Sequence, residues 1–123
     1  MGVTAAVLTE RAAKIGLPIA KDAFEGTLES PVPPLPYLVY AIPHTASRGA
    51  DTINNLVAED WNLELYTVAD DEAAAEIVRR IENEVLFDVD YEKFMAPIED
   101  EECFQTAYEV KELLRKVKGA KKA

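Results

Sequence analysis

The clearest pattern in the chain is an alternation of apolar and polar residues from Trp61 to Thr67. Trp61, Leu63 and Leu65 alternate with the more polar residues between them. Because successive side chains of a strand point to opposite faces of a sheet, this period of two predicts a half-buried strand. We expect this strand to lie in the centre of a small sheet, with the other elements packed against it.

Four further stretches predict strands. The continuous apolar run Tyr37–Ile42 is typical of a strand buried on both faces, and Pro43 is expected to end it because proline cannot donate a hydrogen bond within a sheet. A short strand is expected within Ile19–Phe24. The alternating segments Phe87–Met95 and Cys103–Val110 are expected to form an antiparallel pair.

Helical periodicity appears at three places. Thr4–Ile15 carries apolar residues on one face, and Gly16-Leu17-Pro18 has the composition of a helix end. Glu72–Glu84 follows two aspartates that suit a helix N-cap, and its apolar residues recur every three or four positions. The apolar spacing from Val110 to Val117 predicts that the last strand continues into a short C-terminal helix.

Paired strands with helices segregated from them predict an α+β fold, with a mainly antiparallel sheet of four to five strands and helices packed on one face. A length of 123 residues fits one domain. We expect residues 1–118 to form this domain and residues 119–123 to be a disordered basic tail.

The net charge of −10 argues against sequence-specific binding to nucleic acid, which requires a basic surface. The charge is uneven, since residues 111–123 hold six basic residues and one acidic residue. No apolar run is long enough to span a membrane, and the N-terminus lacks the pattern of a signal peptide. We therefore expect a protein of the cytoplasm, with no membrane contact.

Candidate catalytic residues are few. His44 is the only histidine, and no serine or cysteine nucleophile motif accompanies it, so we interpret it as a loop or contact residue. Cys103 is the only cysteine, which excludes an intrachain disulfide, and it lies in a predicted strand without a local base. We expect no enzymatic activity and no cofactor.

One acidic segment partly matches the pattern of a calcium-binding loop. Asp88, Asp90, Glu92 and Glu99 match positions 1, 3, 5 and 12 of that loop. The sixth position requires glycine for a sharp turn, and Lys93 stands there instead. We therefore expect a solvated strand face followed by an acidic turn, and no metal site.

Interaction residues are expected in two kinds of segment. The polar stretch from His44 to Asn55 is expected to be the loop of a long hairpin and to reach a neighbouring molecule. The acidic run Glu99–Glu102 is expected to meet the basic C-terminal tail of another copy. The candidate interaction residues are His44, Arg48, Asp51, Asn54, Glu99, Asp100, Glu101, Lys116 and Lys118.

Several short motifs follow one another in a characteristic order. They are Gly16-Leu17-Pro18, Pro33-Pro34-Leu35-Pro36-Tyr37-Leu38-Val39-Tyr40, Gly49-Ala50-Asp51, Leu63-Glu64-Leu65-Tyr66-Thr67, Asp70-Asp71, Tyr91-Glu92-Lys93 and Phe104-Gln105-Thr106-Ala107-Tyr108-Glu109. In this order and spacing the chain resembles, from about Leu8 to Val110, a family of small phage and prophage proteins of long-tailed bacteriophages. These are described as tail-terminator, tail-completion or head–tail joining proteins. Members of the family end near the position of Val110, whereas this chain continues to Ala123.

The resemblance implies a structural role in the virion. Such proteins form rings, typically hexameric, at the head-proximal end of the tail tube, where they stop tube growth and receive the capsid connector. The implied partners are other copies of the chain, the tail tube protein and the head–tail connector proteins. The implied location is the tail or neck of the virion, reached from the cytoplasm of the bacterial host, and no catalytic residue is implied.

Three alternatives to the tail-terminator ring protein remain open at this point. The chain is either another neck or minor tail protein, or a free-standing α+β module that captures a peptide at an exposed sheet edge, or a small enzyme with an undetected site. Self-association distinguishes the ring protein from the other classes, because a closed ring requires two different complementary patches on each subunit.

Overall fold

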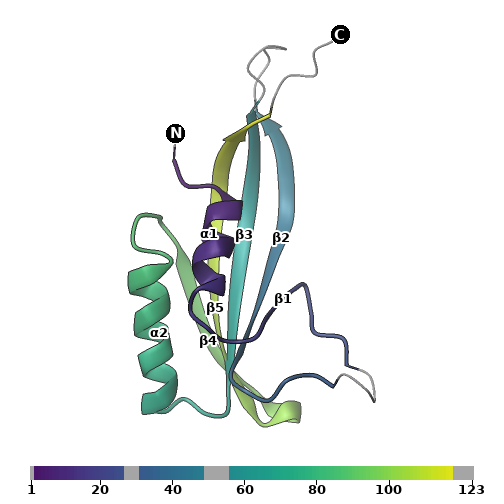
Figure 1. The fold of residues 1–123 in the computed structure, drawn as a ribbon, viewed down its shortest axis with the longest axis vertical. Coiled ribbons are helices and arrows are strands. Elements are labelled where there is room, and N and C mark those ends of the chain that lie inside the picture. The colour runs from purple at the N-terminus through teal and green to yellow at the C-terminus, as the bar shows by residue number, and fades with distance from the viewer. Residues whose placement is uncertain (1, 27–30, 49–55, 118–123) are drawn as a thin grey trace.

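The structure of the chain is a computed structural model that describes residues 2–26, 31–48 and 56–117 (Figure 1). These described residues form two α-helices, five strands and one 3-10 helix. In chain order these are α1 (Ala5–Ala13), β1 (Ile19–Lys21), β2 (Tyr37–Arg48), β3 (Leu56–Thr67), α2 (Glu72–Glu84), β4 (Glu92–Ile98), η1 (Glu99–Glu101) and β5 (Cys103–Lys116).

The five strands form one sheet in the order β1-β2-β3-β5-β4. Only the β1–β2 pair is parallel, and the other three pairs are antiparallel. Both helices contribute to a single hydrophobic core with residues from one face of this sheet, and α1 lies over β3 (Figure 1). The expected α+β fold with a mainly antiparallel sheet is therefore confirmed.

β3 is the central strand, as its alternation predicts. Trp61, Leu63 and Leu65 are completely buried beneath the helices. The indole Nε1 of Trp61 donates a hydrogen bond to Oγ1 of Thr9 on α1, at 3.0 Å. This bond satisfies a polar group that would otherwise be buried without a partner, and it joins α1 to the centre of the sheet.

Both helices begin at a side-chain cap, as expected for α2, and α1 is shorter than the predicted Thr4–Ile15. Oγ1 of Thr4 accepts a hydrogen bond from the backbone N–H of Val7, and the Asp71 carboxylate accepts one from the N–H of Ala74. α1 is followed by Gly16 in the left-handed conformation, with φ of +96°. The bounds of α2 agree with the sequence prediction.

β2 does not end at Pro43, as the sequence analysis expected, but continues to Arg48. The pairing register between β2 and β3 shifts between Ala41 and His44, so Pro43 lies in a β-bulge. A bulge tolerates proline because the residue there has no ladder hydrogen bond to donate. The predicted loop is therefore wrong for residues 44–48, which are strand, and its remainder at 49–55 lies outside the described residues.

β5 likewise continues as a strand to Lys116, so the predicted C-terminal helix is wrong for the described residues. The helical spacing has a different origin, which is a bulge. β3 advances two residues from Trp61 to Glu59 while β5 advances three from Val110 to Leu113. The extra residue returns Leu113 to the buried face, so an apolar spacing of three arises within a strand.

β4 begins later than predicted, at Glu92, and residues 85–91 form a turn after α2. Its antiparallel pairing with β5 confirms the expected hairpin. Pro97 lies within β4 rather than in the following turn, which an edge strand allows because one side of its backbone has no partner strand. The turn itself is formed by η1. No helix among the described residues has the length and apolarity needed to cross a membrane.

Candidate interaction surfaces

The sheet has an extension that passes beyond both helices. It consists of residues 43–48 of β2, 56–60 of β3 and 111–116 of β5, which run side by side to one end of the molecule (Figure 1). Of the predicted interaction residues, His44, Arg48 and Lys116 lie on this strand extension. Asp51, Asn54 and Lys118 lie outside the described residues.

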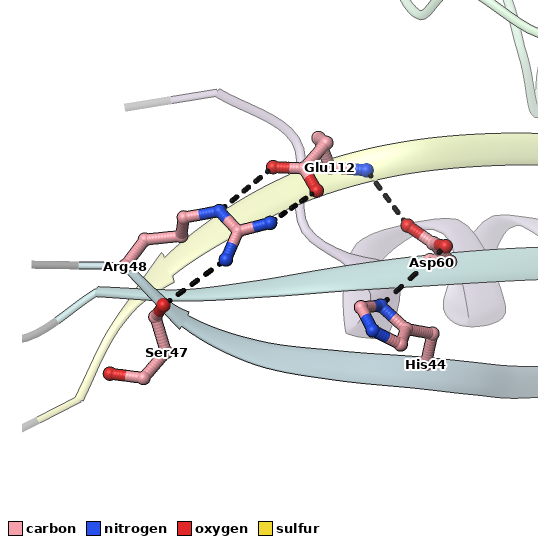
Figure 2. A network of polar contacts seen from close by, with 5 residues as sticks. All are labelled: His44, Ser47, Arg48, Asp60 and Glu112. Atoms are coloured by element: carbon pink, nitrogen blue, oxygen red, sulfur yellow. Dashed lines mark hydrogen bonds and ion pairs between the residues drawn. The ribbon is translucent and has the colours of Figure 1, made fainter.

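Asp60 of β3 contacts both strands that flank it in the extension. The register shifts of both neighbouring strands fall beside it, so Asp60 lies between two bulges. Its Oδ1 accepts a hydrogen bond from the backbone N–H of Glu112 on β5, at 3.1 Å, and its Oδ2 lies 3.8 Å from Nδ1 of His44 on β2 (Figure 2). One carboxylate thus contacts both neighbours of its own strand.

Arg48 and Glu112 make a second connection, which links β2 to β5 across β3. The Arg48 Nε and Nη2 atoms donate to the two carboxylate oxygens of Glu112, at 3.3 and 2.9 Å, and Nη1 donates to the carbonyl of Ser47 (Figure 2). Both side chains are about half exposed, so the pair contributes less than about 1 kcal/mol to stability. Its two-pronged geometry does, however, orient the ends of the two strands.

The side chain of His44 is the part of this network that could take part in acid–base chemistry. Histidine catalysis requires a nucleophile or substrate group within hydrogen-bond reach of the ring. Among the described residues, no hydroxyl or thiol forms a hydrogen bond with His44, whose side chain is 59% exposed. No group of three or more His, Cys, Asp or Glu residues in the described parts of the chain is arranged to hold a metal ion. The contacts that the network does make join the three strands of the extension.

The acidic run Glu99–Glu102 lies at the end of the sheet opposite the strand extension. Glu99, Asp100 and Glu101 form η1, and Glu102 follows in a left-handed conformation with φ of 52°. The 14 residues of β5 separate this acidic end from Lys116, which corresponds to roughly 45 Å at the usual rise of a strand. The structure therefore brings Glu99 to Glu101 together in η1 but places them far from Lys116 of the same chain.

β4 is an exposed edge that the sequence did not reveal. It pairs only with β5, and six of its seven residues are exposed. Phe94 and Met95, which point to opposite faces, are each about half exposed. An edge strand presents unpaired backbone N–H and C=O groups, and apolar side chains beside them favour association with another chain.

The other residues weighed in the sequence have structural roles. Cys103 is buried, and burial together with the charge of Glu101 raises the pKa of its thiol, which disfavours the reactive thiolate. Asp88 forms an ion pair with Arg11 at 2.8 Å, and hydrogen bonds from this arginine lower the pKa of the carboxyl. Glu92 and Glu99 stand at opposite ends of β4, so the residues of the calcium-loop pattern do not converge.

The described residues thus present three candidate interaction surfaces, which are the strand extension, the acidic end and the β4 edge. In the sequence, the acidic run and the C-terminal lysines indicated two of these surfaces. The sequence did not indicate the roles of Asp60 and Glu112, because their contacts depend on strand pairing. No protein-family model matches the chain, and no curated protein matches it either.

Proposed function

We propose that the chain is a non-enzymatic structural protein of a phage or prophage virion, of the tail-terminator or tail-completion type, and that it assembles as a ring at the head–tail junction. The motifs shared with that family support this proposal. The observation that carries it is the position of opposite charges at the two ends of one sheet. Lys116 and the acidic residues of η1 cannot meet within one copy, which supports a contact between copies.

Contacts between two different patches join subunits head to tail. Such a heterologous interface gives a ring if the rotation between neighbours closes, and a filament if it does not. Exposed ion pairs contribute only about 0.2–1 kcal/mol each, so charge sets the orientation and the partner more than the affinity. The apolar residues of β4, Phe94 and Met95, are expected to supply buried area in the assembled state.

In this function the partners are other copies of the chain, the tail tube protein and the connector proteins of the head. The protein acts in the neck of the virion and is made in the cytoplasm of the bacterial host. Its net charge of −10 suits a ring through which DNA passes, because an acidic lining repels phosphates and does not retain them.

A reciprocal charge swap tests the head-to-tail contact. One variant carries Lys111→Glu and Lys116→Glu, and the other carries Glu99→Lys and Glu102→Lys. Each variant alone brings like charges together and is expected to lose assembly on purified tail tubes. A mixture of equal amounts is expected to restore assembly, since every contact then joins opposite charges. Mass photometry and negative-stain microscopy of the tube ends give the readout.

The matched control changes the same number of charges on the two helices, with Lys14→Glu at the end of α1 and Arg79→Glu on the exposed face of α2, and is expected to assemble like the parent protein. Assembly by either swapped variant alone, or failure of the mixture when both variants are folded, would contradict the head-to-tail contact. The measurement uses tail tubes because some ring proteins assemble only on their tube.

A free-standing binding module is the second candidate function, and the exposed β4 edge favours it. An extended peptide can add to such an edge as a further strand, with backbone hydrogen bonds supplying affinity. This function requires a stable monomer that binds one soluble host protein. Phe94→Glu is then expected to abolish that binding, while the charge swaps above leave it unchanged.

A further inference from the structure

Three aromatic rings stand in a row at the end of the sheet near η1. They belong to Phe24, which follows β1, to Tyr37 at the start of β2, and to Tyr66 on β3. The ring centroids of Phe24 and Tyr37 are 4.9 Å apart in an edge-to-face arrangement, and those of Tyr37 and Tyr66 are 5.4 Å apart. Tyr37 and Tyr66 are cross-strand partners on the face opposite the buried Leu65.

Hydrogen bonds fix the last ring of the row. The Tyr66 hydroxyl donates to Oε1 of Glu64 at 2.8 Å and accepts from Nε2 of Gln105 at 3.0 Å. Glu64 and Gln105 come from β3 and β5, so two paired strands hold the phenol in place. The arrangement is therefore built into the sheet rather than left to a mobile side chain.

The row lines a hollow of about 350 Å³. Val32 and Val39 add apolar surface to it, and three carboxylates, those of Asp22, Glu64 and Glu101, also line it. Within the described parts of the chain, none of these carboxylates forms an ion pair with a lysine, arginine or histidine. The hollow thus combines aromatic faces with negative charge that its own surroundings do not neutralise.

The pKa values of both tyrosines of the hollow are raised, mainly by burial and in smaller part by the neighbouring carboxylates. Burial, together with the hydrogen bond to Glu64 and its charge, raises the pKa of Tyr66 to about 12. Burial also raises the pKa of Tyr37, with smaller contributions from the charges of Cys103 and Glu101. Burial disfavours any charge, but the contributions of the Glu64 and Glu101 carboxylates have the opposite effect on a cation, which they attract.

We propose that this hollow binds a cationic side chain of a partner protein, specifically the guanidinium group of an arginine. Aromatic faces attract cations through their quadrupole, and carboxylates add direct attraction. A guanidinium is planar, so it stacks on a ring and presents paired N–H groups to a carboxylate at the same time. Phosphate groups are repelled by the three carboxylates, and an apolar side chain would leave the carboxylates unpaired.

The arginine is expected to come from a different protein. The chain has five arginines, and all of them form ion pairs within their own copy. They are Arg11, Arg48, Arg79, Arg80 and Arg115. A second copy would have to break one of these pairs in order to fill the hollow. The inference does not rest on ring assembly, since the hollow would serve either a virion protein or a binding module.

Titration of the isotope-labelled full chain with a short blocked peptide that contains one arginine tests this site by NMR. Saturable shift changes are expected at Phe24, Tyr37, Glu64 and Tyr66. The same peptide with citrulline in place of arginine has nearly the same shape but no charge, and is expected to bind about tenfold more weakly. A lysine peptide is expected to fall between the two, because its ammonium cannot stack as a plane.

Two variants and one control complete the experiment. Glu64→Gln combined with Glu101→Gln, and separately Tyr37→Leu, are each expected to weaken arginine binding about tenfold. Glu10→Gln, an exposed carboxylate on α1, is the control and is expected to bind like the parent. The proposal is overturned by equal binding of the citrulline peptide, by an absence of saturable shifts up to the solubility of the peptide, or by shifts that map elsewhere. Concentration-dependent shifts at the same residues without peptide would instead identify a second copy as the occupant.

Discussion

Glu112 allows a sharp test of the bulge in β5, because two opposing effects meet at this residue. Its backbone is left-handed, with φ of 57°, and its carboxylate pairs with Arg48. A left-handed backbone costs a residue other than glycine roughly 1–2 kcal/mol. The ion pair is about half exposed and contributes less than about 1 kcal/mol. Replacing Glu112 by glycine removes both effects, whereas replacing it by alanine removes only the ion pair.

We therefore expect Glu112→Ala to be destabilised by about 0.5 kcal/mol and Glu112→Gly to be about as stable as the parent or slightly more stable. The free energy of unfolding of the glycine variant should exceed that of the alanine variant by roughly 1 kcal/mol. This order is the reverse of that in an ordinary strand, where glycine is less stable than alanine by roughly 0.5–1 kcal/mol. The reversal is the signature of the left-handed residue.

Urea unfolding measures these differences. Trp61 is the only tryptophan and is completely buried, so its fluorescence reports the loss of the core. The neighbouring Lys111 has no left-handed backbone, and its glycine and alanine variants provide the matched control with the ordinary order. If Glu112→Gly were less stable than Glu112→Ala, residue 112 would not have a left-handed backbone, and the bulge in β5 would not have the geometry described.

Two further predictions concern the core and its rim. Trp61→Phe removes the hydrogen-bond donor to Thr9 and part of a fully buried ring. We therefore expect the free energy of unfolding, measured with urea and circular dichroism, to fall by about 2–3 kcal/mol. Thr9→Val should then cost less stability in the Trp61→Phe variant than in the parent, because the hydrogen bond is already absent. Pairing with Arg11 lowers the pKa of Asp88 in the folded protein. The ion pair therefore contributes fully to the free energy of unfolding above the ordinary carboxyl pKa, and this contribution is lost as pH falls through the lowered folded value. The urea midpoint of Asp88→Asn should therefore approach that of the parent at low pH, and a constant difference at all pH values would exclude this pairing.

The helices and the central strand were predictable because their signals are local. A cap at Asp71, an apolar residue every three or four positions and a following turn define α2 without reference to the rest of the chain. The alternation around Trp61 likewise identifies a half-buried strand. The charge pattern also predicted correctly that this acidic segment forms a turn, in which Glu99 and Glu101 are exposed.

The errors occurred where a strand departs from regular alternation. Pro43 normally ends a strand, and Val110 and Leu113 are spaced as on a helix, but both positions adjoin bulges. A bulge adds one residue to one strand only, so its presence depends on the partner strand and not on the segment itself. β4 was placed too early at Phe87 because the alternation continues through a turn after α2.

The sequence by itself determined the fold class, the two helices and the uneven charge of this protein, because composition and periodicity act over a few neighbouring residues. Only the tertiary structure decided which distant residues meet. Asp60 joins His44 to Glu112, and Tyr66 stands beside Tyr37. These neighbours are set by the register of paired strands, and register depends on long-range packing that no single segment contains.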